Sequence, residues 1–183
     1  YEDLWIQPAA GDAGGAVGVA FLIDNVALGR PRLERMEHAS YGPAYSDAEI
    51  RAYLDQAGAR YVECGRAALI ARTVDALEGQ NVVGWFQGRM EFGPRALGNR
   101  SILGDPRSPA MQDTMNLKIK FRESFRPFAP SVLLEHAGDW FDFDTRRHSS
   151  PYMLLVCQVA DRRFHADGAA PDDPRRLQKM SEI

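Results

Sequence analysis

The stretch GRMEFGPRALGNRSILGDP (residues 88–106), followed after a short spacer by NLKIKFRESFRPFAP (residues 116–130), decides how this chain of 183 residues is interpreted. Residues 88–130 contain eight of the 22 lysines and arginines but four of the 25 acidic residues, so the stretch carries +4 in a chain of net charge −3. Apolar residues and prolines are interleaved with these charges, as in a folded site and unlike a solvated tail. The pattern therefore indicates a local anion-binding function.

Length and composition favour an ordinary globular protein. A chain of 183 residues makes one domain, or one domain and a fragment of another. No apolar run approaches the roughly 18 residues of a membrane helix, and no signal peptide is visible, so we expect no membrane contact. Cys64 and Cys157 are too few for a disulfide framework and belong to no zinc-binding pattern. We predict a reduced, cytoplasmic protein with both cysteines buried as small apolar residues.

Both ends of the sequence look cut. Tyr1 is not a start residue, and the chain enters an apolar run at once. The last residues, LQKMSEI, stop without a closing element. We expect the chain to be a piece of a longer polypeptide.

The N-terminal region predicts a strand at residues 4–6, a turn at residues 8–11 and a helix over residues 13–24 with Asp12 as its N-cap. Glycine inside a helix costs roughly 1 kcal/mol relative to alanine. Gly14, Gly15 and Gly18 therefore suggest that a ligand or another element approaches the backbone closely. A strand, a glycine turn and a helix N-terminus commonly bind anions, and close helix packing is the alternative.

Residues 25–45 have no sustained period and predict a linker. Ser46 and Glu49 form a capping box that opens a helix ending near Gly58. Its expected inward residues are Ile50, Tyr53, Leu54 and Ala57. The following pattern predicts a strand at 61–62, a helix over 66–78 with Ala67, Ile70, Val74 and Leu77 inward, and a buried strand over 82–86.

The basic stretch and the residues after it continue the alternation of helices and strands, which predicts an α/β sandwich. The expected elements are a turn at 92–94, a short helix at 94–98, a strand at 101–103, a helix at 109–117 with Asp113 and Asn116 on its polar side, a strand at 129–134, a helix at 135–141, a central strand at 152–159 and a loop at 161–174.

The cations of the stretch have the right chemistry to hold a phosphorylated anion. Arginine makes two parallel hydrogen bonds to phosphate, and phosphoryl chemistry depends mostly on fixed positive charge. A period of two would put Lys120 and Arg122 on the same side of an extended segment, and Pro127 and Pro130 keep residues 125–130 extended. The alternative is a solvated basic face with surface ion pairs. The candidate residues are the cations Arg95, Arg100, Lys120, Arg122 and Arg126 and the neutral Asn99, Ser101 and Asn116.

The segments GRMEFGPRALGNRSIL (88–103) and IKFRESFRPFAP (119–130) resemble the O-carbamoyltransferase family, which includes nodulation-protein-U-type and antibiotic-tailoring enzymes. The segment QPAAGDAGGAVGVA (7–20) is similar to the end of that family's first domain. The resemblance covers most of the chain and is densest from residue 82 to residue 141.

The resemblance implies two domains. The first is a transferase domain of the actin-like ATPase fold, and residues 1–28 would be its tail. After a linker at 29–45, residues 46–183 would be a truncated YrdC-like domain, a twisted mixed sheet with flanking helices. This domain would form carbamoyl-adenylate from carbamoyl phosphate and ATP, and the first would transfer the carbamoyl group to a small-molecule hydroxyl at a metal centre. The fragment alone is expected to be inactive.

Individual residues inherit expected roles from the resemblance. Lys120 and Arg122 match a catalytic pair that binds phosphate groups, and Asp12 matches a ligand of the metal, iron or magnesium, whose histidine partners lie outside this chain. Gly14 and Gly15 match a turn that approaches nucleotide. The resemblance also places Arg95, Asn99, Arg100, Ser101 and Arg126 in the expected pocket, to which residue type adds Asn116.

Two other functions stay open. YrdC-like domains also occur in tRNA modification, so RNA binding is one alternative, although a net charge of −3 and a pI near 5.8 argue against a broad footprint. The phenylalanines beside the cations are spaced for burial more than for base stacking. The third hypothesis is a non-catalytic interaction domain. The acceptor and the oligomeric state also stay open, with a homodimer as one alternative.

Overall fold

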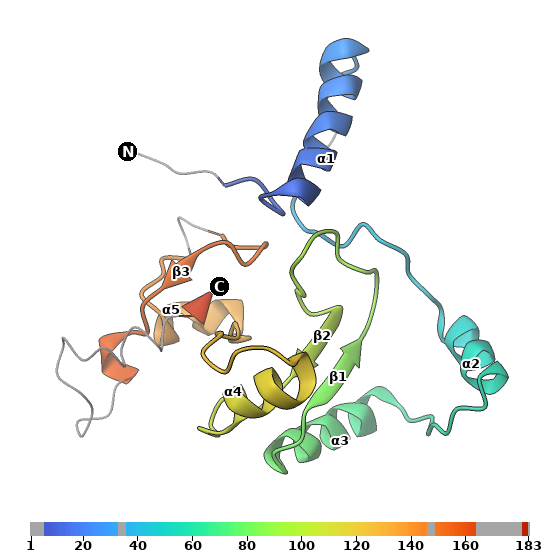
Figure 1. Cartoon of the computed structure of the whole chain (residues 1–183), viewed down its shortest axis with the longest axis vertical. Helices are drawn as coiled ribbons and strands as arrows, with labels where there is room; N and C mark the ends of the chain where they lie inside the picture. The colour runs from blue at the N-terminus through green and yellow to red at the C-terminus, as the bar shows by residue number, and fades with distance from the viewer. Residues whose placement is uncertain (1–5, 33–35, 146–148, 164–180, 183) are drawn as a thin grey trace. The chain divides into compact units, whose positions relative to one another are not determined.

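The computed structural model describes residues 6–32, 36–145, 149–163 and 181–182 (Figure 1). These residues form two compact units. Unit 1 combines the chain up to Ala39 with the chain from Arg122 onward, and unit 2 is Ser40–Phe121. Helices and short antiparallel strands occur together, which makes the chain a mixed α/β protein, as expected. The predicted domain boundaries at residues 28 and 46 stay predictions.

Unit 2 is built around one antiparallel hairpin. Strands β1 and β2 pair with Phe86 opposite Arg100 and Val83 opposite Leu103. The loop between them carries most of residues 88–103, which we call the first basic motif (Figure 1). The elements in order are α2 (Asp47–Gln56), α3 (Arg66–Glu78), β1 (Val83–Phe86), β2 (Arg100–Leu103), the short α4 (Met111–Asp113) and the π-helix η2 (Thr114–Lys120).

The two longer helices of unit 2 begin and end at the residues that local chemistry dictates. The Ser46 hydroxyl accepts the backbone N–H of Glu49, and the Glu49 carboxylate accepts the backbone N–H of Ser46 at 2.8 Å, which confirms the capping box. Glycines follow both helices: Gly58 has a positive φ of 62°, and Gly79 is the C-cap of α3. The backbone N–H and the side-chain hydroxyl of Ser46, which both bond the Glu49 carboxylate, lower the pKa of Glu49.

The faces of these helices are less buried than their periodicity predicts. Ile50 and Leu54 are half-buried, but Tyr53 is 70% exposed, and Ile70 and Val74 are each 47% exposed. The expectation that these apolar residues all point into a core is wrong within unit 2. A 3.6-residue period identifies residues that share a face, but it does not say whether anything covers that face.

The core of unit 2 lies where α4 and η2 pack against the segment that follows β2. Met111 and Met115 are both 5% exposed, and a Cβ at Gly104 would come within 2.6 Å of the Met115 sulfur. A larger residue at this position would require the two methionine side chains to move. Asn116 is fully buried beside them, so its predicted place on a polar helix face is wrong.

Unit 1 contains a helix near its start and a small group of elements near its end. The elements are α1 (Asp12–Leu22), the π-helix η1 (Ile23–Ala27), the 3-10 helix η3 (Leu134–His136), α5 (Ala137–Trp140), β3 (Val156–Cys157), the 3-10 helix η4 (Asp161–Arg163) and β4 (Ser181–Glu182). Strand β3 pairs antiparallel with β4, and Phe141 bridges Val159. The small core here includes Ala137, Phe141 and Ala160.

Several predicted elements are absent or shorter. Residues 61–62, 94–98 and 129–133 are irregular, and the expected strand at 152–159 has only two residues in strand geometry, Val156 and Cys157. The described strands form two separate two-stranded sheets, so the larger twisted mixed sheet is not seen among the described residues. Cys64 is exposed and Cys157 half-buried, against the expectation that both are buried.

Three further expectations need comment. Of the predicted strand at 4–6, residues 4 and 5 lie outside the described residues, as does most of the predicted loop at 161–174. The turn at 8–11 is confirmed. In the described part of the chain, no helix combines the length and the apolar character needed to cross a bilayer.

We expect Ser46→Ala to loosen helix α2, because the change removes the side chain that holds the first turn. The free energy of local opening should fall by about 1 kcal/mol. Amide hydrogen exchange of α2 residues measures this opening. Thr73→Ala is the matched control: its hydroxyl bonds only the Leu69 carbonyl within α3, and its loss should change opening of that helix by less than about 0.5 kcal/mol. Equal effects in both helices would contradict the capping argument.

Candidate functional site

The loop between β1 and β2 is organised around one buried carboxylate, that of Glu91. The residue is 8% exposed, and its Oε1 accepts the backbone N–H groups of Asn99 at 2.7 Å, Leu97 at 2.8 Å and Arg100 at 3.4 Å. Burial by itself raises the pKa of Glu91, but these N–H groups outweigh burial and lower it. Glu91 is therefore ionised at neutral pH and joins the two arms of the loop.

Two predicted site residues, Asn99 and Ser101, take part in the same arrangement. The Asn99 amide donates to the Ser40 hydroxyl at 2.8 Å and to the Arg89 carbonyl at 2.7 Å. The Ser101 hydroxyl accepts the Gly98 N–H at 2.9 Å. These contacts hold the loop together, so the structure assigns both side chains a structural task within unit 2.

Arg100 also makes contacts inside the hairpin. Its guanidinium donates to the carbonyls of Gln87 at 2.7 Å, Asn99 at 2.9 Å and Gly88 at 3.2 Å. The guanidinium carbon lies 3.4 Å from the centre of the Phe86 ring, its partner across the strands. The planar guanidinium of Arg100, which has the right shape to bind phosphate, thus donates its hydrogen bonds to backbone carbonyls here.

Arg95 lies in the middle of the loop, between Glu91 and the residues that Glu91 holds. It is exposed, and Gly93 two residues earlier has a φ of 107°, a conformation that glycine adopts without strain. The predicted short helix at 94–98 is absent, so Arg95 is carried by an irregular loop whose two ends are fixed. Its expected role as a pocket residue stays a prediction.

The π-helix η2 presents Lys120 and buries Asn116. Lys120 is exposed at the last residue of η2, and the next residue, Phe121, is left-handed with φ 50° and ψ 49°. The segment is therefore not extended, and the argument that a period of two places Lys120 and Arg122 on one side is wrong. Phe121 is 85% exposed and Phe125 76%, which also contradicts the expectation that the phenylalanines beside the cations are buried.

The cations at the start of the second part of unit 1 have close partners. The Arg122 guanidinium lies 4.9 Å from the centre of the Phe128 ring, and Arg126 donates to Glu123 at 2.9 Å. Arg122 is half-buried and Arg126 is exposed. Residues 126–130 are irregular and non-helical, as the prolines predict.

The N-terminus of α1 differs from its prediction by one residue. Gly11, not Asp12, is the N-cap, and Asp12 is the exposed first residue of the helix without a capping hydrogen bond from its side chain. Gly14 is buried, and a Cβ there would come within 2.6 Å of the Ala9 carbonyl oxygen and 2.8 Å of that of Pro8. At Gly15 a Cβ would meet nothing within 4 Å. Gly14 is therefore required by the chain's own turn, the packing alternative raised by the sequence.

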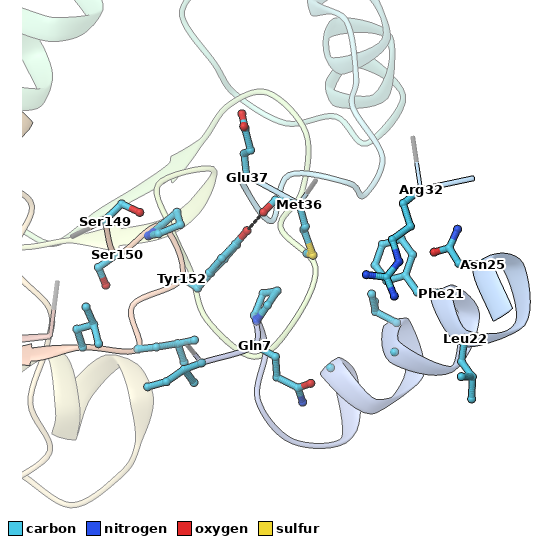
Figure 2. A pocket seen from close by; sticks show the side chains of 18 of the residues that line it. Gln7, Phe21, Leu22, Asn25, Arg32, Met36, Glu37, Ser149, Ser150 and Tyr152 are labelled. Atoms are coloured by element: carbon cyan, nitrogen blue, oxygen red, sulfur yellow. Dashed lines mark hydrogen bonds between the residues drawn. The ribbon is translucent and has the colours of Figure 1, made fainter. Parts of the chain in front are cut away.

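Unit 1 contains a half-open cavity of about 890 Å³ beside α1 (Figure 2). Phe21 and Leu22 contribute apolar wall, and Tyr152 donates its hydroxyl to the Met36 carbonyl at 2.6 Å across it. Of the predicted site residues, only Gly14 lines this cavity. The charged side chains on the wall are Arg32 and Glu37, so this hollow is not the cation-rich pocket expected from the sequence.

Helix α1 offers one candidate ligand for a metal ion. Asp12 is a single exposed carboxylate, and the described residues contain no group of three His, Cys, Asp or Glu side chains that could hold a metal ion. One carboxylate does not make a stable site for iron or magnesium. The described residues therefore do not fit a metal on their own.

The structure thus groups the predicted residues by unit. Arg95, Asn99, Arg100 and Ser101 belong to the hairpin of unit 2, with Asn116 and Lys120 on η2 of the same unit, whereas Arg122, Arg126, Asp12, Gly14 and Gly15 belong to unit 1. Sequence reasoning missed Glu91, whose carboxylate accepts three backbone N–H groups of the loop. A signal was available: Glu91 is the one acid between Gly88 and Gly104, flanked by Met90 and Phe92.

Comparison with known proteins gives consistent matches. A family model described as Carbamoyltransferase C-terminus matches residues 74–182. The chain is 52% identical over 167 residues to the protein sll1178 of Synechocystis, 41% identical over 186 residues to nodulation protein NolNO of Sinorhizobium fredii, and 33% identical over 177 residues to a 3'-hydroxymethylcephem-O-carbamoyltransferase of Streptomyces clavuligerus. These alignments cover 88%, 99% and 93% of this chain.

The chain spans only 27%, 27% and 31% of the length of these three relatives. The matched family region includes the whole β1–β2 hairpin, its loop and η2. The matched region therefore contains the loop in which Glu91 organises the backbone.

The two neighbouring glycines of α1 give a matched test of what surrounds them. Gly14→Ala should lower the free energy of unfolding by roughly 1–3 kcal/mol, because the new methyl group would force the turn at Pro8 and Ala9 to move. Gly15→Ala should raise it by up to about 1 kcal/mol, because alanine is the better helix former and meets open space. Urea unfolding of the two variants measures both. A stabilising Gly14→Ala would contradict the close approach.

Proposed function

Because the chain belongs to the carbamoyltransferase C-terminal family, we propose that it is part of an O-carbamoyltransferase whose full-length form uses carbamoyl phosphate and ATP to make carbamoyl-adenylate. In this proposal the carbamoyl group then passes to a hydroxyl of a small molecule. The protein works in the cytoplasm, and the fragment alone is inactive. The remainder of a twisted YrdC-like sheet and the actin-like domain, of which residues 1–28 are the tail, lie in the longer protein.

One observation carries the proposal: the basic motifs fall inside the matched family region and present cations on segments fixed by that region's own contacts. Arg95 is exposed on the loop that Glu91 closes, and Lys120 is exposed at the end of η2. Carbamoyl phosphate and ATP are both multiply charged anions, which fixed cations bind without further reorganisation. This electrostatic match supports a phosphate-handling role for unit 2.

The proposed reaction has three steps. Water releases phosphate from carbamoyl phosphate and leaves carbamate, whose oxygen attacks the α-phosphorus of ATP and expels pyrophosphate. The acceptor hydroxyl then attacks the carbamoyl carbon, and AMP leaves. We assign Lys120 and Arg122 to the charge that develops on the phosphates, and Arg95 and Arg126 to substrate binding; Asn116 is fully buried and is given a structural role. Asn99, Arg100 and Ser101 support the loop from inside, through the contacts described above.

Residues of unit 1 have a smaller part in this proposal. Asp12 offers one carboxylate, so this chain supplies at most one ligand to a metal, and further ligands would come from the longer protein. Gly15 leaves open space beside α1 where a nucleotide could approach, whereas Gly14 is already packed against the turn. The acceptor class is a hydroxyl-bearing small molecule, in line with the name of the Streptomyces relative.

Loss of the two catalytic cations tests the proposal in the full-length protein. Lys120→Ala and Arg122→Ala should each reduce carbamoyl phosphate-dependent ATP–pyrophosphate exchange by about a hundredfold, because each removes fixed charge near the transferring phosphate. Lys118→Ala is the matched control, an exposed cation on η2 to which we assign no role, and it should keep nearly full activity. Full exchange in both catalytic variants would refute their assignment.

A second function, RNA binding, is favoured by one observation. Phe121 follows Lys120 directly and is 85% exposed in its unit, as a stacking platform for a base would be. A filter-binding assay of the full-length protein with tRNA tests it. RNA binding predicts salt-sensitive retention that Phe121→Ala weakens about tenfold, because stacking on one ring contributes a few kcal/mol at most. Absence of binding at low salt removes this function.

A further inference from the structure

Glu91 stands apart from the other charged residues of the loop between β1 and β2 because its side chain is buried. It is 8% exposed, whereas Arg95, four residues later, is exposed. One of its carboxylate oxygens, Oε1, takes the N–H groups of Leu97, Asn99 and Arg100. A buried carboxylate that accepts three backbone N–H groups is strongly held, because hydrogen bonds to an ionised acceptor are about twice as strong as neutral ones.

The contacts of Glu91 bracket Arg95 along the chain. The tip of the loop, residues 92–96, lies between Glu91 itself and Leu97, whose N–H it accepts at 2.8 Å. The base of the loop is fixed independently: Asn99 bonds Ser40, and Met90 exchanges backbone hydrogen bonds with Gly42 and Pro43 at 2.8 and 2.9 Å. With the base fixed in this way, the bond from Glu91 to Leu97 closes the tip of the loop.

We propose that Glu91 is a positioning residue, which holds the loop at 92–96 so that Arg95 is presented to the phosphate group of the substrate. The inference rests on the proposed function, because it takes carbamoyl phosphate or ATP as the anion that Arg95 meets. We assign Glu91 no contact with the substrate, because a carboxylate beside a phosphate would be repelled by it and Oε1 of Glu91 already accepts N–H groups. Its effect reaches the substrate through Arg95 alone.

The ionised state of Glu91 matters for this role. The backbone N–H groups lower its pKa against the opposing effect of burial, so the carboxylate keeps its charge at neutral pH. A glutamine in its place would have the same size and one carbonyl oxygen, but it would lose the charge-assisted part of all three bonds and add an N–H₂ group with no acceptor among these contacts. Glu91→Gln is therefore a minimal change that loosens the tip without leaving a cavity.

A double-mutant cycle in the full-length protein separates positioning from general structural support. We expect Glu91→Gln to lower kcat/KM of carbamoyl phosphate-dependent exchange about tenfold and Arg95→Ala about a hundredfold. The double variant should stay within about twofold of Arg95→Ala, because loosening the loop has no further effect once its arginine is gone. Glu91→Asp, which keeps the charge, should recover part of the loss if Glu91→Gln folds poorly.

Amide hydrogen exchange gives a readout that does not need activity. Protection of the Leu97 and Asn99 amides should fall at least about tenfold in Glu91→Gln. The matched control is Asp105→Asn, which alters another buried carboxylate of unit 2, one bound to Arg107 and 5% exposed, and should leave those two amides unchanged. Unchanged protection in Glu91→Gln would overturn the proposal.

The outcomes also distinguish this inference from the function on which it rests. If the wild-type protein catalyses exchange and the losses of Glu91→Gln and Arg95→Ala simply multiply, the role of Glu91 is wrong and the proposed function stands. If the wild-type protein shows no exchange with carbamoyl phosphate, the proposed function is wrong, and the assignment of Glu91 to substrate presentation falls with it.

Discussion

The bond from one carboxylate oxygen of Glu91 to the backbone of the opposite loop arm is the constraint on which unit 2 depends. Without it, the N–H groups of Leu97 and Asn99 would need other acceptors, and the loop would lose the charge-assisted bonds that reinforce the contacts of Asn99 and Arg100. A negative charge at the centre of a positive loop also offsets the repulsion among its arginines. The single acid of the first motif is thus the element that lets the basic residues be held close together.

Arginine chemistry explains why residue type alone could not assign roles within the motif. The planar fork that suits phosphate suits backbone carbonyls equally well, and Arg100 uses it for the carbonyls of Gln87, Gly88 and Asn99. Asn99 and Ser101, which were predicted to line a pocket, likewise use their polar groups for hydrogen bonds that hold the loop. The motif therefore has two kinds of members: residues that build the loop and exposed residues, such as Arg95, that the loop presents.

The sequence predicted best what local chemistry controls. The capping box at Ser46 and the glycine after α3 set helix ends over a few residues, and both agree with the structure. It predicted poorly what depends on distant partners. The strand expected at 129–134 does not form, and Val74 lies on an exposed face, because β-branched content and periodicity do not reveal whether a neighbouring strand or layer is present. Asn116 was misplaced for the same reason: its place on a polar helix face was inferred from residue type alone, yet the side chain is fully buried.

Local pairing also decides where the positive charge of the stretch acts. Arg107 is bound by the Asp105 carboxylate, Arg126 by that of Glu123, and Arg100 by carbonyls and the Phe86 ring. These contacts neutralise or hold three of the cations, although a count of charges along the sequence gives every cation equal weight. Within unit 2 the exposed positive side chains of the two motifs include Arg95 on the loop and Lys118 and Lys120 on η2. The positive charge of the stretch is therefore not evenly available: in unit 2 it includes one exposed side chain at the loop tip and two on the π-helix η2.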